Sequence, residues 1–269
     1  MVVLRPKVAF TIPVEAECIS PDVFAARPAK ELGKLEVLWG NKRKPLSQLF
    51  EIDPSGEEDE IVIEGDVSAV KHIGARMTTG LITIHGNAGM HLGTEMDGGR
   101  IVVHGDVGDW LGAEMKDGLI HVKGNTGNLA GAGYRGSKTG MAGGSIIIEG
   151  NAGDEVGELM CGGTIAVAGS LGTFAGTLMT GGTIVCLGAL GGRAGAAMDG
   201  GTIIALTPPQ LLPTFIPQGT DRPSHVGELL QQLKGNGLPL AEEQIGALFA
   251  RYEGDISGKG KGEVFVRTG

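Results

Sequence analysis

Two histidines and a glutamate recur at nearly equal intervals in this sequence of 269 residues, and they are its strongest candidates for chemistry. His85 precedes His104 by 19 residues and follows Glu64 by 21. If a fold superimposes these positions, two imidazoles and a carboxylate meet, which is a ligand set that zinc accepts. The chain would then be a stand-alone enzyme or a metal or ligand binder. A solvated face of mixed charge explains the same residues, because the sequence shows no outer partners that orient metal-bound histidines.

The elements that would position these residues repeat every 19 residues. Short runs of alternating aliphatic residues end at a glycine, and seven of the nine methionines recur in step with them. A unit with one short strand cannot bury its own apolar side, so the units must stack with parallel strands about 4.8 Å apart. Alternate strand positions then form two inward columns, which begin at Ile61 and Ile63. The recurring methionines are Met77, Met96, Met115, Met141, Met160, Met179 and Met198.

This repeat predicts an all-β fold, a right-handed parallel β-helix of about seven 19-residue coils over residues 59–206. The two ends of such a stack need cover, because they expose strand edges. We expect residues 1–58 to form a small mixed α/β N-terminal cap. We expect residues 207–269 to form an extended segment and a helical C-terminal cap, with helices over Ser224–Lys234 and Leu240–Tyr252.

One unit is 26 residues long, and its extra residues lie between Gly131 and Met141. An insertion into stacked units must leave the stack as a loop, and such loops are often binding elements. Tyr134, Arg135 and Lys138 in this loop are therefore candidate partner-binding residues. A flexible glycine-rich excursion explains the insertion equally well.

Outward strand positions become apolar toward the C-terminal coils. An exposed apolar strip on stacked strands needs a cover. Either the C-terminal helices of the chain or a partner subunit supplies it, and the sequence favours neither, so the strip is a second candidate partner-binding surface. The strip comprises Ile147, Ala166, Ala168, Val185 and Leu187.

Composition narrows the class of protein. A formal net charge of -9, with Lys42–Lys44 as the one basic cluster, argues against a nucleic-acid partner. The sequence contains no apolar run long enough for a membrane span and no secretory signal, so we expect a cytoplasmic protein without membrane contact. Cys18, Cys161 and Cys186 are widely spaced and fit neither a disulfide framework nor a zinc or iron–sulfur motif.

Four segments carry a family likeness: Ile12–Ala25, Leu35–Lys42, the inserted Gly133–Gly136 and Lys261–Val264. With the repeats between them, they resemble the C subunit of formylmethanofuran dehydrogenase, over essentially the whole chain. The same family includes the C subunit of the bacterial formyltransferase/hydrolase complex. The coils are also similar to the C-terminal domain of the glutamate synthase large subunit, which shares the glycine pattern and lacks the first of these segments.

The resemblance implies a non-catalytic scaffold subunit with no catalytic residue, metal or cofactor of its own. In the bacterial complex, an amidohydrolase-like hydrolase subunit, a formyltransferase subunit and a further dehydrogenase-like subunit would be its partners. That complex converts formyl-tetrahydromethanopterin to formate through a methanofuran-type carrier during formaldehyde oxidation, so the carrier, tetrahydromethanopterin and zinc are implied on partner subunits. The alternative is the C subunit of a tungsten or molybdenum formylmethanofuran dehydrogenase that reduces CO2, with pterin metal and iron–sulfur clusters on other subunits.

The charged fraction bears on this choice. Charged residues make up 20% of the chain, below the roughly 25% of an average soluble protein. Hyperthermophilic proteins are enriched in lysine and glutamate. The composition therefore favours the bacterial complex over the archaeal dehydrogenase.

Overall fold

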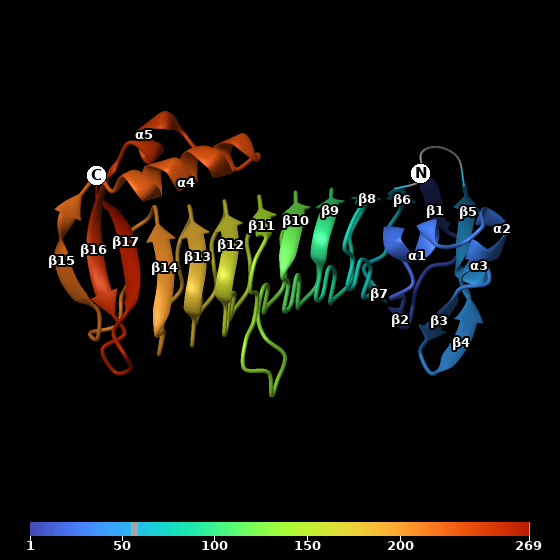
Figure 1. The fold of residues 1–269 in the computed structure, drawn as a ribbon, viewed down its shortest axis with the longest axis horizontal. Helices are drawn as coiled ribbons and strands as arrows, with labels where there is room; N and C mark the ends of the chain where they lie inside the picture. Colours follow the sequence, from blue (N-terminus) through green and yellow to red (C-terminus); the bar gives the residue numbers. More distant parts are fainter. Residues whose placement is uncertain (55–58, 269) are drawn as a thin grey trace.

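A computed structural model describes residues 1–54 and 59–268. The chain is elongated, with its N-terminus and C-terminus toward opposite ends of the long axis (Figure 1). A 13-stranded, mainly parallel sheet runs along this axis, and a 4-stranded sheet lies at the N-terminal end. The strands of the large sheet, in spatial order, are β15 (Ile216–Asp221), β16 (Leu248–Gly254), β17 (Gly262–Thr268), β14 (Gly200–Ala205), β13 (Thr180–Cys186), β12 (Cys161–Val167), β11 (Ser145–Ile148), β10 (Asp117–Val122), β9 (Asp97–Val103), β8 (Leu81–His85), β6 (Glu60–Glu64), β1 (Val2–Pro6) and β5 (Phe50–Asp53).

Each central strand pairs with the strand one unit further along the chain. Ile82 pairs with Ile101, and Ile101 pairs with Ile120. The same register continues across the long unit, where Ile120 pairs with Ile146. A second parallel ladder of single bridges links other turns of the same units, as at Val67, Ala88 and Val107. Successive units are therefore hydrogen-bonded to each other at more than one place around their circumference.

The interior follows the predicted columns. Both inward strand columns are buried, from Ile61 and Ile63 onward. All seven recurring methionines have no exposed surface. The unbranched thioether of methionine fills irregular space well, which suits it to a corner between strands and turns. The sequence prediction of these buried positions is confirmed.

Corner residues adopt a backbone conformation that the sequence analysis did not foresee. Besides glycines, two residues of most units have positive φ, for example His91 (62°) and Glu95 (53°). The left-handed region costs a non-glycine residue about 1–2 kcal/mol. Hydrogen bonds to the next unit offset this cost, because His91 N–H donates to Asp109 O at 3.0 Å and Glu95 N–H donates to Ala113 O at 2.8 Å.

Asparagine and aspartate side chains link the turns that follow the strands. Asn87 Oδ1 accepts the backbone N–H of Asp106 at 2.9 Å. Asp106 Oδ1 in turn accepts the N–H of Asn125 at 2.6 Å, and Asn125 Oδ1 accepts the N–H of Asn151 at 2.9 Å. Each side chain thus supplies an acceptor to a backbone donor in the next unit.

The N-terminal residues cover one end of the stack. β1 pairs in parallel with β6 and antiparallel with β5, so the first strand of the repeat has no free edge. The last four residues of the expected cap, 55–58, lie outside the described residues. The remaining elements of this region are α1 (Pro21–Ala25), α2 (Ala29–Leu32), α3 (Leu46–Leu49), and the small sheet of β4 (Lys42–Pro45), β3 (Glu36–Trp39), β2 (Val14–Glu15) and β7 (Val70–Lys71).

The C-terminal region corrects one prediction. The helix expected over Ser224–Lys234 is present as α4 (Ser224–Gly235), whereas the helix expected over Leu240–Tyr252 is wrong beyond α5 (Glu242–Ile245). β16 follows α5 and pairs with β17, which extends the sheet in parallel from β14. The open edge of β14 favours strand over helix, because an unpaired edge leaves backbone groups without partners. No helix in the described part of the chain has the length and apolar character needed to cross a membrane.

The close approach of neighbouring units predicts a strong effect of one methyl group. A Cβ added at Gly86 would lie 2.2 Å from the carbonyl oxygen of Gly65, whereas a Cβ at Gly192 would have no atom within 4 Å. We expect Gly86→Ala to lower the free energy of unfolding by about 1–3 kcal/mol or more, since backbone cannot move aside cheaply. Gly192→Ala should change it by less than about 0.5 kcal/mol. Urea denaturation followed by circular dichroism measures both, and equal effects would contradict the stacking argument.

Candidate docking site around the inserted loop

The inserted loop is fastened at its base to the next unit. Gly133 N–H donates to Glu158 O at 3.1 Å, and Gly140 N–H donates to Leu159 O at 2.7 Å. Between these points the chain leaves the stack and returns to it. Figure 1 shows this loop in yellow-green, projecting below the row of strands. Its residues are therefore presented outside the body of the molecule on an anchored base.

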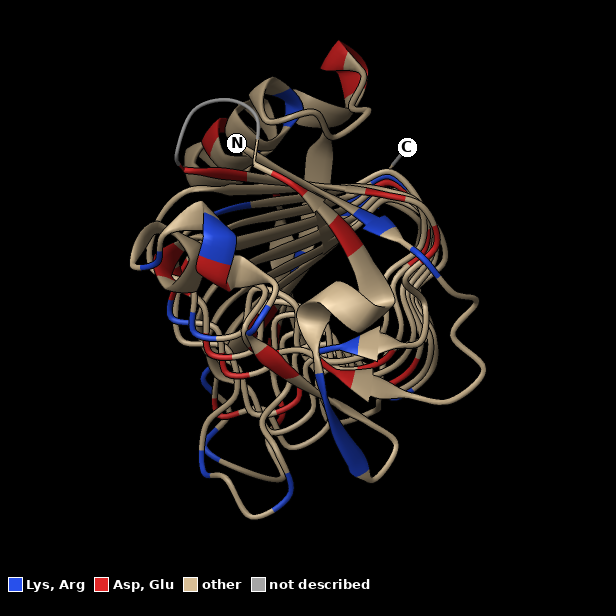
Figure 2. Cartoon of the chain, turned by 90° about the vertical axis from the view of Figure 1, so that its right-hand side faces the viewer, with Lys and Arg blue, Asp and Glu red and all other residues tan. Residues whose placement is uncertain are grey.

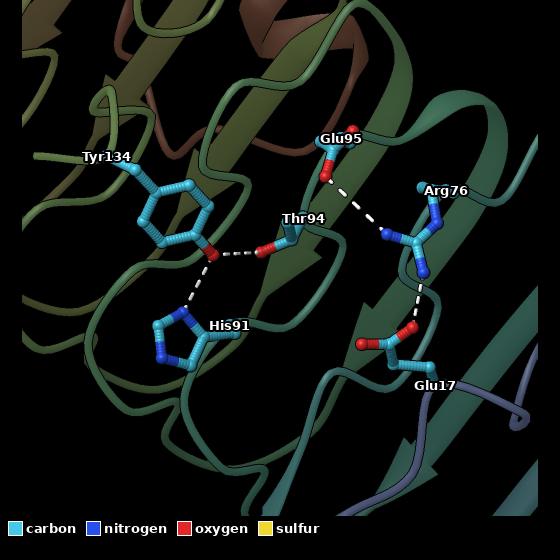
Figure 3. Close-up of polar contacts among 6 residues, drawn as sticks. All are labelled: Glu17, Arg76, His91, Thr94, Glu95 and Tyr134. Carbon is cyan, nitrogen blue, oxygen red and sulfur yellow. Dashed lines mark hydrogen bonds and ion pairs between the residues drawn. The ribbon is translucent and has the colours of Figure 1, made fainter. Parts of the chain in front are cut away.

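Tyr134 fixes the loop to the preceding units. Its hydroxyl lies 2.8 Å from His91 Nδ1 and 2.9 Å from Thr94 Oγ1, and Thr94 is almost fully buried (Figure 3). The backbone N–H of Tyr134 donates to Glu114 Oε1 at 3.0 Å. Hydrogen bonds to two earlier units therefore hold the first turn of the loop, and we call these contacts of Tyr134 the latch.

Aromatic rings extend this contact. The Tyr134 ring stacks on Trp110 with centroids 4.9 Å apart, and His91 stacks on His72 at 4.6 Å. His72, His91 and Trp110, which we call the ring row, occupy one corner position in three successive units, each with φ of 62–64°. Stacked rings at these separations are favourable beyond the area they bury. The loop thus rests against a row of rings that the repeat itself places in line.

Burial sets the protonation of this cluster. It lowers the pKa of His91 to about 4, with the neighbouring His72 as a lesser cause. His91 is then neutral at neutral pH, so its Nδ1 can accept the Tyr134 hydroxyl proton while the Tyr134 oxygen accepts from Thr94. Burial also raises the pKa of Tyr134, which keeps its hydroxyl protonated. These groups satisfy one another and serve to hold the loop.

An ion-pair network lies beside the latch. Arg76 pairs with Glu17 and also with Glu95, the latter at 3.6 Å (Figure 3). Glu17 belongs to the N-terminal region, whereas Arg76 and Glu95 occupy one corner position in successive units. The network joins the N-terminal region to the same side of the stack that carries the loop.

Arg135 and Lys138 are the exposed charges of the loop. Within residues 1–54 and 59–268 neither cation has an ion-pair partner within 4.0 Å. Figure 2 shows lysine and arginine in blue along the loops at the lower edge of that view. On a chain of net charge -9, two unpaired cations on a projecting loop form a local positive feature.

The apolar strip is covered by the chain itself. Ile147, Ala166 and Val185 have at most a trace of exposed surface, and Ala168 and Leu187 are half-buried beside them. The prediction of a partner contact is therefore wrong for the first three, because α4 packs over this part of the sheet (Figures 1 and 2). Val226, Leu230 and Leu233 of α4 belong to the same buried apolar cluster as the three strip residues.

The three residues of the alternative metal site lie at the ends of neighbouring strands, but other contacts engage them. The rings of His85 and His104 stack on each other with centroids 4.7 Å apart. Glu64 instead accepts a hydrogen bond from Arg5 at 2.6 Å, which balances its charge. In the part of the chain that the structure describes, no group of three or more His, Cys, Asp or Glu side chains is placed to hold a metal ion. These residues do not fit a metal site.

Sequence reasoning missed two clusters. One is the ring row, although the 19-residue spacing of His72, His91 and Trp110 was a readable signal. The other lies under the C-terminal region, where the buried His121 lies 2.8 Å from Glu149 through its Nε2 atom. Burial lowers the pKa of His121. No spacing rule indicates this second pair, because His121 and Glu149 stand at different repeat positions.

Comparison with known protein sequences identifies relatives that match part of this chain. No known protein-family profile matches the sequence. The chain is 45% identical over 89 residues to the C subunit of molybdenum-containing formylmethanofuran dehydrogenase 1 from Methanothermobacter marburgensis, a match that covers 33% of this chain and 22% of that protein. It is 38% identical over 93 residues to the C subunit of tungsten-containing formylmethanofuran dehydrogenase 2 from Methanothermobacter wolfeii, covering 33% and 34%. The match thus spans about a third or less of these relatives' length.

A solved structure matches over the whole length. It is a chain of the formyltransferase/hydrolase complex FhcABCD from Methylorubrum extorquens, crystallised with methylofuran, with a TM-score of 0.92 and 35% identity over 99% of this chain and 100% of that chain. This chain belongs to the family of formylmethanofuran dehydrogenase C subunits. These comparisons confirm the resemblance to the C-subunit family that the sequence indicated.

The latch predicts how this member of the C-subunit family responds to loss of one hydroxyl. Tyr134→Phe keeps the ring stack and removes the bonds to His91 and Thr94, at a cost of about 1 kcal/mol. We expect trypsin to cleave faster after Arg135 and Lys138, since the loop opens more often. Tyr252→Phe is the matched control. Equal cleavage rates in the two variants would show that the hydroxyl does not hold the loop.

The lowered pKa of His91 predicts a pH dependence of stability. An unfolded histidine has its ordinary pKa of 6.5, whereas the folded value is about 4, so the unfolded state binds more protons between these pH values. Stability contributed by neutral His91 is complete above about pH 6.5 and decreases as the pH falls toward 4. His91→Gln should flatten this part of the profile. Thermal melts from pH 7 to 4 test it, and parallel profiles would contradict the assignment.

Proposed function

We propose that the chain is a non-catalytic scaffold subunit in a cytoplasmic complex of several different proteins, which converts formyl-tetrahydromethanopterin to formate through a methanofuran-type carrier, as in formaldehyde oxidation. The observation that carries this proposal is the whole-length likeness to a chain of a formyltransferase/hydrolase complex crystallised with methylofuran. The compositional preference for the bacterial complex agrees with it. A scaffold role also agrees with the latch, whose polar groups are bonded to one another.

We propose that residues 59–206 form a right-handed parallel β-helix similar to the glutamate synthase C-terminal domain, capped by residues 1–58 and 207–269. Two features support this interpretation. Sheet pairing at a constant register joins each unit to the next, and a second ladder of bridges recurs on other turns of the same units. Such a solenoid requires a strand that recurs about every 19 residues and pairs in parallel with the strand of the next unit.

In this proposal the inserted loop docks a partner. Tyr134 anchors it, Arg135 and Lys138 meet the partner, and Ala168 and Leu187 contribute at the margin of α4. The partners are a hydrolase subunit of amidohydrolase type, a formyltransferase subunit and a further dehydrogenase-like subunit. Zinc, tetrahydromethanopterin and the methanofuran-type carrier are assigned to those subunits, because the His85, His104 and Glu64 side chains do not fit a metal.

The second candidate function is that of the C subunit in a tungsten- or molybdenum-containing formylmethanofuran dehydrogenase. The observation in its favour is that curated relatives of both kinds match a third of the chain at 38–46% identity. A stand-alone enzyme or metal binder is the candidate from another class, and the stacking of His85 on His104, with Glu64 bound to Arg5, weighs against it.

The two complexes predict different companions for the chain. We expect natively expressed protein to elute in a large peak with a hydrolase and a formyltransferase, identified by mass spectrometry, and with zinc as the bound metal. The isolated chain should show no turnover. Charge reversal of the loop in an Arg135→Glu, Lys138→Glu double variant should reduce the amount of partner retained.

Other elution results would overturn the proposal in distinct ways. A peak with tungsten or molybdenum and iron–sulfur subunits would assign the chain to the dehydrogenase. A single peak at 27.6 kDa, without partners, would contradict a subunit role and would return attention to chemistry on the chain itself.

A further inference from the structure

One corner of the stack changes its chemistry at the inserted loop. On the N-terminal side of the loop, three successive units place Arg76, Glu95 and Glu114 at this corner position. On the other side, the equivalent residues of the next two units are Leu159 and Leu178. All five have positive φ of 53–60°, so the backbone is the same throughout. Only the side chains differ, from charged before the loop to apolar after it.

The apolar residues of this corner reach the surface. Leu178 is 42% exposed, and Leu159 and Phe174 are partly exposed. Leu159 N–H donates to Thr177 O at 3.0 Å, which places Leu159 and Leu178 in adjacent units. Phe174, with φ of 63°, occupies the other corner position of the Leu178 unit. We call Leu159, Phe174 and Leu178 the corner patch.

Neither folding nor solubility accounts for the corner patch. Left-handed backbone at an exposed position favours glycine, asparagine or aspartate. A leucine there combines backbone strain with an apolar surface in water. The charged residues that fill the same position before the loop show that the corner does not require leucine. Exposed apolar residues that gather at one place mark interaction surfaces.

Positive charge borders the corner patch. The loop base is hydrogen-bonded to Glu158 and Leu159, and Arg135 lies close enough to act on the Glu158 carboxylate. Arg193 lies over the Phe174 ring, with its guanidinium carbon 5.3 Å from the ring centroid. The Glu158 carboxylate lies at the same border, where burial and the neighbouring Glu155 raise its pKa and Arg135 acts in the opposite direction.

We propose that the corner patch and the inserted loop together form one docking surface for a partner subunit of the complex, whose contacting face has an apolar centre and carboxylates opposite Arg135 and Lys138. This inference rests on the proposed scaffold function and names the surface that serves it. Apolar contacts at the centre supply affinity, and the charged rim sets orientation and association rate. The latch at Tyr134 holds the rim in place before the partner arrives, which lowers the ordering cost of binding.

A charge placed at the centre of the patch tests the surface. Leu178→Asp is made in the full chain, co-expressed with the partner subunits of its native complex. Ile256→Asp is the matched control, because Ile256 is 56% exposed and lies in the turn between β16 and β17, outside the patch. We expect partner affinity to fall about tenfold or more for Leu178→Asp alone, with thermal melts of both isolated variants near that of the parent. Equal retention of partners by the two variants would overturn the proposal.

Salt dependence tests the chemistry of the partner. With carboxylates opposite the loop cations, affinity of the parent falls as ionic strength rises, and the Arg135→Glu, Lys138→Glu variant loses this dependence. A salt-independent parent would overturn the acidic rim. A dimer of the isolated chain that Leu178→Asp abolishes would assign the patch to a second copy instead. Failure of the parent to retain any partner would remove the scaffold function itself, an outcome distinct from a failure of the patch.

Discussion

The distance between the backbones of neighbouring units is the constraint on which this structure depends. Glycines such as Gly86 allow one turn to lie directly against the carbonyl of the previous turn. Corner residues accept left-handed backbone because their N–H groups then meet carbonyls one unit away. Once this contact repeats, every outward side chain is aligned with its counterpart in the next unit. The ring row beneath the loop and the corner patch beyond it both follow from that alignment.

The sequence predicts the interior well, because burial of one side chain type at a fixed period leaves a direct trace in it. The methionine column and both strand columns are visible for this reason. The ends of the stack are less predictable. Residues 240–252 have a pattern compatible with a helix. The later part of this segment forms a strand instead, because it pairs with β17, which itself pairs with the edge of β14. That decision depends on residues more than ten positions away, which local periodicity does not reveal.

Some features of the candidate site can likewise be predicted from the sequence, and others cannot. The loop is detectable because it interrupts the period, and its cations are plain in the sequence. The Tyr134 latch is hidden, since its partners His91 and Thr94 stand about 40 residues earlier and meet it only through the stack. The apolar strip at Ile147 and Ala166 signals correctly that a cover exists. Its pattern contains no information on whether that cover comes from α4 or from another chain.

The long unit shows that a loop can be inserted on the surface of this molecule without changing the length of the stack. Ile120 pairs with Ile146 in the same register that joins the 19-residue units, although seven additional residues intervene. The axial rise per unit, about one strand spacing, is therefore unaffected by what leaves the stack sideways. A binding element can be lengthened, shortened or replaced at any corner while the separation of the two covered ends stays constant. The stack thus acts as a fixed-length rod on which each corner can evolve separately.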